Sequence, residues 1–346
     1  MSSKQQLLNP IRQQEPTPSL TLSRRPRRNR QSAAIRALVR ETTLHPCDLV
    51  NPLFIVDGCD EEQPIASMPD VSRKSIDRTL QEVEDLYSLG IRAVVIFTKI
   101  SSDLKDNTGS EALRPNNLMQ QAIRTLKKEF PEMCIMTDIA LDPFTDHGHD
   151  GIVDPEGKIL NDKTLEALAE MSLRAAEAGI DIVAPSDMMD GRVAYIRHVL
   201  DTNGFTDVGI LSYTAKYASA MYGPFRDALG SSLSFGDKKT YQMDPANARE
   251  ALIEAALDEA EGADFLLVKP ALHYLDILAR IRQITHLPLA AYHVSGEYAM
   301  VMAAAEKGWL DADDVLMETT TAIKRAGADL VFTYAAKRLA KLIYTS

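Results

Sequence analysis

The chain has 346 residues, of which 45% are hydrophobic and 25% are charged, and its formal net charge is −11 at pH 7. This composition is typical of a globular protein, and no apolar run approaches the roughly 18 residues that a membrane-spanning helix requires. The three cysteines (Cys47, Cys59 and Cys134) are far apart, which argues against a disulfide framework or a zinc ribbon and favours a reducing cytoplasm.

The N-terminal residues differ in charge from the rest of the chain. Residues 1–30 carry a balance of +6, mostly from arginine, so the remainder carries −17. This acidic remainder would repel phosphates and argues against nucleic-acid binding. Import into an organelle stays open as an alternative, because transit peptides are rich in arginine and poor in acids. We predict that residues 1–35 form a basic, partly disordered arm that contacts a neighbouring subunit.

After the arm, apolar strand-like runs alternate with amphipathic helical stretches, which predicts parallel strands joined by helical crossovers. The predicted helices include 75–89, 117–130, 164–178 and 247–261, and a glycine often follows the helix, as at Gly90 and Gly179. Eight strands are predicted: Leu49–Val56, Ala93–Phe97, Cys134–Ala140, Asp181–Ala184, Val208–Ser212, Phe265–Val268, Leu289–Val294 and Leu330–Thr333. We therefore predict an α/β fold, a (β/α)8 TIM barrel over residues 36–346. An open doubly wound sheet is less favoured, since no glycine-rich turn follows the first strand.

In such a barrel the catalytic groups lie at the carboxyl ends of the strands. Two predicted strands lead into lysines there, Lys216 and Lys269. Burial lowers the pKa of a lysine, and two lysines in one pocket lower each other's pKa, so each amine becomes a nucleophile toward carbonyls. Two Schiff-base lysines in one site would suit the joining of two carbonyl substrates. The alternative is that each lysine merely pairs with a carboxylate at the end of its strand.

The stretch Leu229–Thr240 is rich in glycine, serine and charge and has no helical period. We predict a mobile lid that carries Lys238 over the site. The alternative is an ordinary solvated loop.

Three stretches resemble the porphobilinogen synthase family, also called 5-aminolevulinate dehydratases: Lys216–Arg226, Val268–Pro270 and Ala184–Arg192. The resemblance extends from about Arg27 to the C-terminus. It implies a TIM barrel that assembles as a homo-octamer, with an arm wrapped around a neighbouring subunit. It also implies the condensation of two 5-aminolevulinate molecules to porphobilinogen, with loss of two waters, in tetrapyrrole (heme) biosynthesis.

The resemblance also implies roles for individual residues. Lys269 would form the Schiff base with the first substrate and Lys216 with the second, while Asp142 and Asp150 would hold the substrate amine and shuttle protons. The remaining residues would bind substrate. Arg226 and Lys238 would bind one substrate carboxylate, and Ser295 and Tyr334 would bind the other. Tyr292 would lie against Lys269, and further contacts would come from Ser186, Tyr222, Phe225 and Gln242.

The family comparison also bears on metals. Zinc-dependent members have three cysteines where this chain has Ala140, Asp142 and Asp150, so no catalytic zinc is expected. A different metal centre at His147, His149 and Asp150 is a weaker alternative. By resemblance alone, Glu254 would hold an allosteric Mg2+ at a subunit boundary. Two rival functions stay open: a Schiff-base aldolase with a single iminium lysine, and a non-catalytic ligand-binding barrel.

Overall fold

The computed structural model describes residues 22–345 and divides the chain into two compact units, one up to Glu41 and one from Thr42 onward. The smaller unit contains a short 3-10 helix (Pro26–Arg30) and helix α1 (Ala33–Leu38), and neither helix buries a residue. The boundary predicted after residue 35 falls inside α1, so the division lies after this helix. Residues 1–21 of the predicted arm lie outside the described residues.

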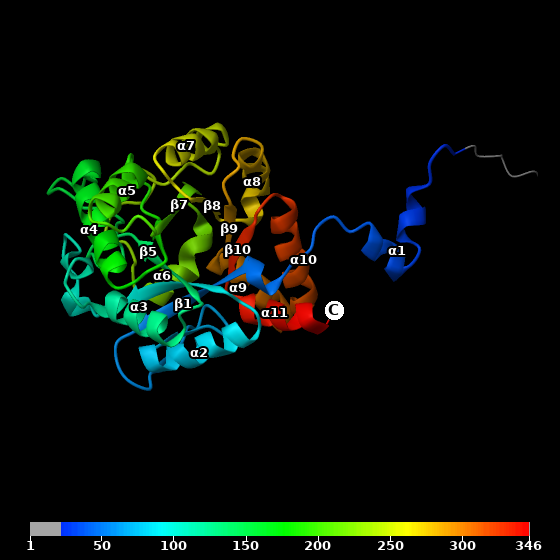
Figure 1. Ribbon diagram of the computed structural model, residues 1–346, viewed down its shortest axis with the longest axis horizontal. Helices are drawn as coiled ribbons and strands as arrows, with labels where there is room; N and C mark the ends of the chain where they lie inside the picture. Colours follow the sequence, from blue (N-terminus) through cyan, green and yellow to red (C-terminus); the bar gives the residue numbers. More distant parts are fainter. Residues whose placement is uncertain (1–21, 346) are drawn as a thin grey trace, which may run out of the picture. The chain divides into compact units, whose positions relative to one another are not determined.

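The larger unit is a closed barrel of parallel strands with helices around it (Figure 1). The barrel closes because the first strand pairs in parallel with both the second and the last strand of the barrel. Its strands are β1 (Leu49–Val56), β4 (Ala93–Lys99), β5 (Cys134–Ile139), β6 (Ile182–Pro185), β7 (Gly209–Lys216), β8 (Phe265–Lys269), β9 (Leu289–His293) and β10 (Leu330–Thr333). The predicted (β/α)8 barrel is confirmed.

The strands are buried because their side chains face either the barrel interior or the surrounding helices. All eight residues of β1, for example, are buried. The helices of this unit are α2 (Ile76–Ser88), α3 (Leu118–Glu129), α4 (Asn161–Glu177), α5 (Arg192–Thr202), α6 (Gly223–Leu229), α7 (Arg249–Ala260), α8 (Leu275–Arg282), α9 (Ser295–Glu306), α10 (Ala312–Arg325) and α11 (Ala336–Thr345). Each of the four predicted helices is present, although α4 begins three residues earlier than its apolar period indicated.

Two features of the sheet differ from the prediction. The short strands β2 (Glu62–Pro64) and β3 (Ser72–Lys74) form a hairpin beside β1, and they lack the apolar character by which the other strands were recognised. The strand predicted to end at Ser212 continues to Lys216, with a shift in its pairing to β8 between Ser212 and Ala215. The lysine is therefore part of the sheet itself.

Within residues 22–345, no helix is both long enough and apolar enough to cross a bilayer. Cys47, Cys59 and Cys134 are all free thiols in the structure.

Candidate active site

Lys216 and Lys269 are the last residues of two neighbouring strands, β7 and β8, and they are direct partners in the parallel register. Both side chains are buried, and both line the same pocket at the carboxyl end of the barrel. The register thus brings two amines into one site although 52 residues separate them in sequence.

The amine of Lys269 is surrounded by aromatic rings. Its Nζ lies 4.5 Å from the ring centre of Tyr292, 4.8 Å from that of Phe225 and 5.2 Å from that of Tyr213. No hydrogen bond from this Nζ is found within residues 22–345. Burial, with the charge of Lys216 adding to it, lowers the pKa of Lys269 to about 7. A large fraction of this lysine is therefore a neutral amine near pH 7.

The amine of Lys216 has a polar environment instead. Its Nζ lies 3.3 Å from Asp150 Oδ2, donates to the backbone oxygen of Ser186 and lies 3.4 Å from the Ser186 hydroxyl. The ion-pair alternative therefore describes Lys216 in part, whereas it does not describe Lys269. The two amines differ because a carboxylate, that of Asp150, lies close to the amine of Lys216 but not to that of Lys269.

Asp150 lies at the centre of a buried network of charges. Its Oδ1 accepts from Lys238 at 2.6 Å, and its Oδ2 accepts from Gln242 at 3.4 Å as well as from Lys216. Lys238 also contacts Asp142 Oδ2 at 3.3 Å. Burial tends to raise the pKa of Asp150, but the charges of Lys216 and Lys238 outweigh burial and lower this pKa to about 2. Asp150 is therefore ionised, and it joins the segment carrying Lys238 to Lys216 at the end of β7, although Asp150 itself does not line the pocket.

Asp138 has the opposite electrostatic character. It is the penultimate residue of β5, lines the pocket and is buried. Burial raises the pKa of Asp138 to about 6, although the charge of Lys216 opposes this shift. Near neutral pH, Asp138 can therefore gain or lose a proton, whereas Asp150 stays ionised.

The pocket brings together most of the residues predicted to bind substrate. Of the predicted set, those lining it are Ser186, Tyr222, Phe225, Arg226, Lys238 and Gln242, together with Asp142 and both lysines. Tyr292, Ser295 and Tyr334 do not line it. The hydroxyl of Tyr292 is 3.1 Å from that of Tyr334, and the hydroxyl of Ser295 accepts from the backbone N–H of Phe225 at 3.0 Å. These three residues form the wall behind Lys269 and Phe225.

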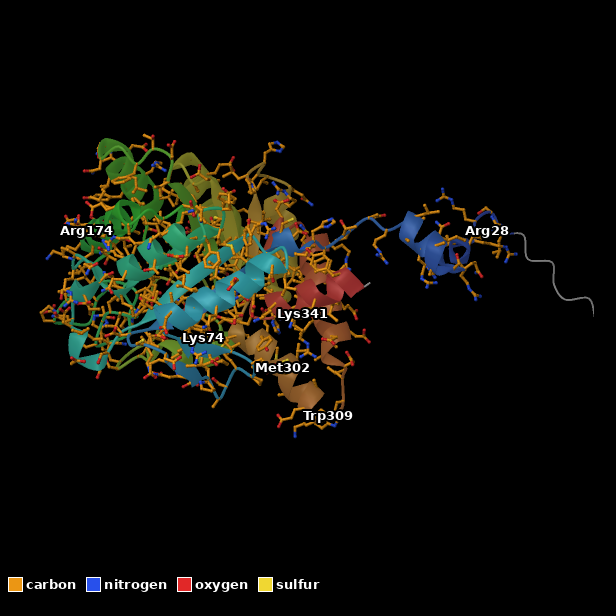
Figure 2. All side chains as sticks on the ribbon, turned by 60° about the horizontal axis from the view of Figure 1, so that its bottom comes forward. Arg28, Lys74, Arg174, Met302, Trp309 and Lys341 are labelled. Carbon is orange, nitrogen blue, oxygen red and sulfur yellow. The ribbon has the colours of Figure 1, made fainter. Side chains whose placement is uncertain are left out.

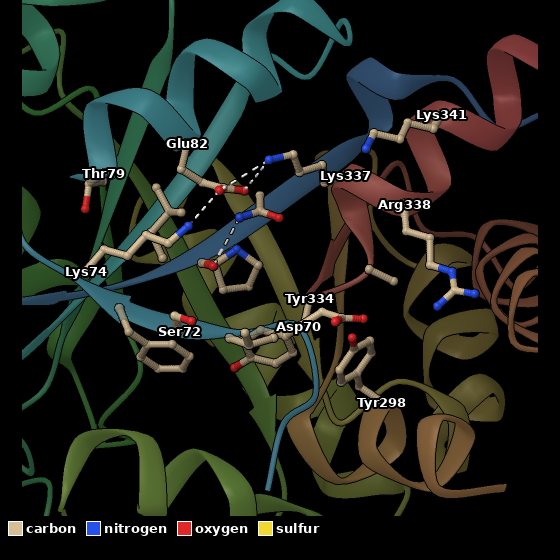
Figure 3. Close-up of a pocket in the computed structure, with 16 residues that line it drawn as sticks. Asp70, Ser72, Lys74, Thr79, Glu82, Tyr298, Tyr334, Lys337, Arg338 and Lys341 are labelled. Atoms are coloured by element: carbon tan, nitrogen blue, oxygen red, sulfur yellow. Dashed lines mark hydrogen bonds and ion pairs between the residues drawn. The ribbon is translucent and has the colours of Figure 1, made fainter. Parts of the chain in front are cut away.

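Tyr334 also lines a second pocket, which Figure 3 shows beside β1, α2 and α11. Its cations Lys74 and Lys337 both pair with Glu82, at 2.8 Å and 3.3 Å. This pocket contains neither lysine of the strand ends, and its Lys74 and Lys337 are held in ion pairs. The pocket of Lys216 and Lys269 is therefore the candidate active site.

Sequence reasoning gave no role to several groups around the lysines. Asp138 was recognisable as the polar residue near the end of a strand, but Tyr213 had no such signal because it lies between the predicted end of its strand at Ser212 and Lys216. Arg192 is fully buried and pairs with Asp258 at 3.2 Å. It also lies 3.9 Å from Asp187, the residue that follows the pocket residue Ser186 in the chain. A buried arginine is visible only once helices α5 and α7 are packed against the barrel.

Glu254 lies in the middle of α7, outside the pocket. It is partly buried, and burial raises its pKa to about 7, with Arg192 opposing and Asp258 adding to the shift. Ile253 and Leu257, on the same helix, expose 60% and 51% of their surface. Within residues 22–345, no group of three or more His, Cys, Asp and Glu side chains is arranged to hold a metal ion.

The fold and the site together define a class of enzyme. A parallel barrel that presents two buried lysines, flanked by carboxyl groups and aromatic rings at the carboxyl end of its strands, is suited to reactions of carbonyl compounds through Schiff bases. Two amines allow two carbonyl substrates to be held at once.

Comparisons with known proteins identify the family. The family model for delta-aminolevulinic acid dehydratase matches residues 23–342. Delta-aminolevulinic acid dehydratase of Chlamydia pneumoniae is 53% identical over 94% of this chain and 98% of its own length, and that of Bradyrhizobium diazoefficiens is 53% identical over 95% and 93%. The crystal structure of the Toxoplasma gondii enzyme, a complex with the reaction product porphobilinogen, superposes with a TM-score of 0.92 at 51% identity over 94% of this chain and 92% of that chain. The chain belongs to the delta-aminolevulinic acid dehydratase (porphobilinogen synthase) family and is a hydro-lyase of porphyrin biosynthesis.

Proposed function

We propose that this enzyme condenses two molecules of 5-aminolevulinate to porphobilinogen through Schiff bases at both Lys216 and Lys269. The observation that supports this most strongly is their pairing in the register of β7 and β8, which presents both amines to one pocket. Each imine forms when the amine adds to the substrate ketone and water leaves. The iminium then withdraws electrons, so that the neighbouring carbon loses a proton more readily than it would beside a free ketone.

Lys269 begins the chemistry on the first substrate as the free amine. Its aromatic surroundings disfavour the ammonium form, and no close carboxylate holds the proton on it. Lys216 binds the second substrate, and Asp150 and Ser186 orient its amine. Asp142 and Asp150 hold the substrate amine and move protons, and the raised pKa of Asp138 lets that carboxyl group exchange a proton at neutral pH.

The two substrate carboxylates bind to separate groups of residues, one lining the pocket and one in the wall behind Lys269 and Phe225. Arg226 and Lys238 bind one, with Gln242 beside them, whereas the hydroxyls of Ser295 and Tyr334 bind the other. Because Lys238 contacts Asp150 and Asp142 in the structure, it exchanges one of these partners for the substrate carboxylate. Tyr222, Phe225 and Tyr292 provide the apolar wall around the reacting carbons.

Borohydride reduction with 5-aminolevulinate, followed by peptide mapping, tests the proposal. We expect secondary-amine adducts at both Lys216 and Lys269. An adduct on only one lysine at saturating substrate would contradict two-site Schiff-base catalysis and would favour an aldolase-like mechanism.

The metal requirement follows from the donor atoms. Thiolates, which favour zinc, are absent at Ala140, Asp142 and Asp150, and the two oxygens of Asp150 already accept from Lys216 and Lys238. These residues do not fit a tetrahedral zinc site. We expect turnover to survive 1,10-phenanthroline. A loss of activity that zinc alone restores would refute this expectation.

An allosteric Mg2+ at Glu254 and a homo-octamer complete the proposal. One carboxylate with several waters suits Mg2+. Of the charged groups near Glu254, the carboxylates of Asp258 and Asp190 would favour a cation there, whereas the guanidinium of Arg192, which pairs with Asp258, would oppose one. Two surfaces support assembly: the exposed apolar residues Ile253 and Leu257 beside Glu254, and Trp309 between α9 and α10, which is 73% exposed (Figure 2). We place the assembly in the cytoplasm, with import into an organelle as the alternative, since plant relatives carry chloroplastic in their names.

A further inference from the structure

The lid segment, defined here as residues 230–242, contains neither helix nor strand and carries Lys238 into the pocket. The predicted lid began at Leu229, which is the last residue of α6. Lys238 and Gln242 hold this segment to Asp150 from inside the pocket. These contacts cannot by themselves keep the lid in place during the reaction, because Lys238 and Asp150 also serve the substrates.

A second group of contacts holds the lid segment from outside the pocket, against the aspartate-rich loop that follows β5. The backbone N–H of Ser234 donates to the backbone oxygen of His147 at 3.2 Å. A Cβ added to Gly148 would lie 2.7 Å from the backbone oxygen of Ser232, and Gly148 has φ +75°. The close approach of the two backbones therefore requires glycine at this position.

His149 contributes both ring nitrogens to this contact. Its Nε2 lies 3.2 Å from the backbone oxygen of Phe235, and its Nδ1 lies 3.1 Å from the hydroxyl of Tyr241. A carbonyl oxygen only accepts, so Nε2 carries the hydrogen and Nδ1 accepts from the Tyr241 hydroxyl. The imidazole also packs on the Phe235 ring, with 4.8 Å between the ring centres. One buried side chain thus joins the lid segment at two points.

Tyr241 connects this outer contact to the charged network. Its hydroxyl accepts from the backbone N–H of Asp150 at 3.3 Å while it donates to His149. Its own backbone N–H donates to the backbone oxygen of Lys238 at 3.4 Å. The backbone N–H of Gln242 donates to the same oxygen at 2.8 Å, so residues 238–242 form one turn. Tyr241 therefore contacts the backbone on both sides of the Lys238–Asp150 ion pair.

We propose that Tyr241 and His149 are positioning residues that latch the lid segment over the two lysines and set the geometry of Lys238 and Asp150. They touch neither lysine of the strand ends and take no proton from substrate. Their effect is on the equilibrium between the closed and the open lid, so it appears in substrate binding more than in turnover at saturation. The inference rests on the proposed roles of Lys216, Lys238 and Lys269.

Tyr241→Phe tests the latch, because it removes one hydroxyl and keeps the ring. Losing the hydrogen bonds of this hydroxyl should raise KM for 5-aminolevulinate roughly three- to tenfold, with a smaller change in kcat. Trypsin should cleave the lid segment after the exposed Lys239 faster by a similar factor in the absence of substrate. The matched control is Tyr195→Phe on α5, which should change neither KM nor the cleavage rate. The ring of Tyr195 is also partly exposed, and its hydroxyl makes no hydrogen bond within residues 22–345.

The double variant gives a sharper test. His149→Phe keeps a ring against Phe235 but has no ring nitrogen, so it removes the hydrogen bond to Tyr241 together with the one to the Phe235 oxygen. If the two residues act as one latch, Tyr241→Phe with His149→Phe raises KM no more than His149→Phe alone. Additive effects would overturn the shared latch, and so would an unchanged cleavage rate in Tyr241→Phe, whatever its KM.

These readouts separate the latch from the proposed Schiff-base chemistry. Cleavage is measured without substrate, and it reports on the lid alone. Borohydride trapping at saturating substrate should still modify both Lys216 and Lys269 in Tyr241→Phe. If trapping fails in the unaltered enzyme, the lysine assignment is wrong whatever the lid does.

Discussion

At the scale of single residues, the two lysines of the site differ in the side chains that surround them. Lys269 faces the rings of Tyr213, Phe225 and Tyr292, whereas Lys216 faces Asp150 and Ser186. Aromatic rings hold an ammonium less firmly than a close carboxylate does. Burial among these rings therefore disfavours the ammonium form of Lys269, which suits this amine to addition to a ketone.

Lys269→Arg should remove nearly all activity while the fold survives. Arginine keeps the positive charge but cannot be deprotonated in a protein, so no imine forms. We expect a loss in kcat on the order of a thousandfold or more. Circular dichroism reports on the fold and a turnover assay on activity, and appreciable residual turnover would refute the assignment. Lys216→Arg is the matched variant: it should also abolish turnover, yet one substrate should still be trapped at Lys269.

The pH dependence of trapping follows from the lowered pKa of Lys269. Burial and the charge of Lys216 bring this pKa to about 7, so the reactive neutral amine is lost as the pH falls below 7 and accumulates as it rises above 7. Between pH 6 and pH 8 the neutral fraction should rise about tenfold. Reductive trapping with 5-aminolevulinate across this range, mapped at Lys269, measures it. A midpoint near the ordinary lysine value would show that the amine is not desolvated before substrate binds.

At the scale of single elements, β7 carries one of the two strand-end lysines and α7 carries Glu254. The pairing of β7 with β8 shifts between Ser212 and Ala215, after which Lys216 and Lys269 come into register. Helix α7 packs against this strand, and Asp258 on α7 accepts from the hydroxyl of Ser212 at 2.6 Å. A change on α7 can therefore reach the strand that carries Lys216.

Glu254 on α7 provides the test of the proposed Mg2+ effect. Glu254→Ala should abolish stimulation by Mg2+, while both lysines are still trapped by substrate and borohydride. The stimulation itself should be modest, within the roughly 1–3 kcal/mol typical of allosteric coupling, because an ion shifts an equilibrium only by its differential affinity for the two states. Titrations of activity with Mg2+ in both proteins measure this. Full stimulation in Glu254→Ala would turn attention to Asp142 and Asp150 as the ion's ligands.

At the scale of the whole molecule, the basic arm and the acidic barrel are separate compact units. In the described part of the smaller unit, which extends beyond the predicted arm to Glu41, Leu38 and Val39 expose 85% and 48% of their surface, and neither helix of this unit buries a residue. A segment without a core of its own gains stability only by packing on another surface. This observation supports a role for the arm in assembly.

Deleting residues 1–30 should yield smaller oligomers. The deletion removes a segment of charge +6 and leaves bodies of charge −17, so contacts between subunits are lost and their mutual repulsion rises. Analytical ultracentrifugation gives the size of the assembly, and activity should fall as the assembly shrinks. A truncated protein that remains octameric would show that the arm does not support assembly.

The sequence by itself determined the barrel and the position of both lysines along it. Periodicity and glycine caps depend on neighbouring residues, so β1 and β10 were predicted to the residue. The other barrel strands were predicted to within two residues at each end, except β7, which continues four residues beyond its predicted end. The residues that line the pocket were named through family resemblance, and six of the nine predicted to bind substrate lie in it.

Only the tertiary structure decided how the groups at the site differ. Whether a lysine meets a carboxylate or an aromatic ring depends on residues far away in the chain, such as Asp150 for Lys216 and Tyr292 for Lys269. The contact of His149 with the lid segment likewise joins residues separated by 92 positions. Burial and the local field, which set pKa values, are sums over such distant neighbours, and no local pattern in the sequence encodes them.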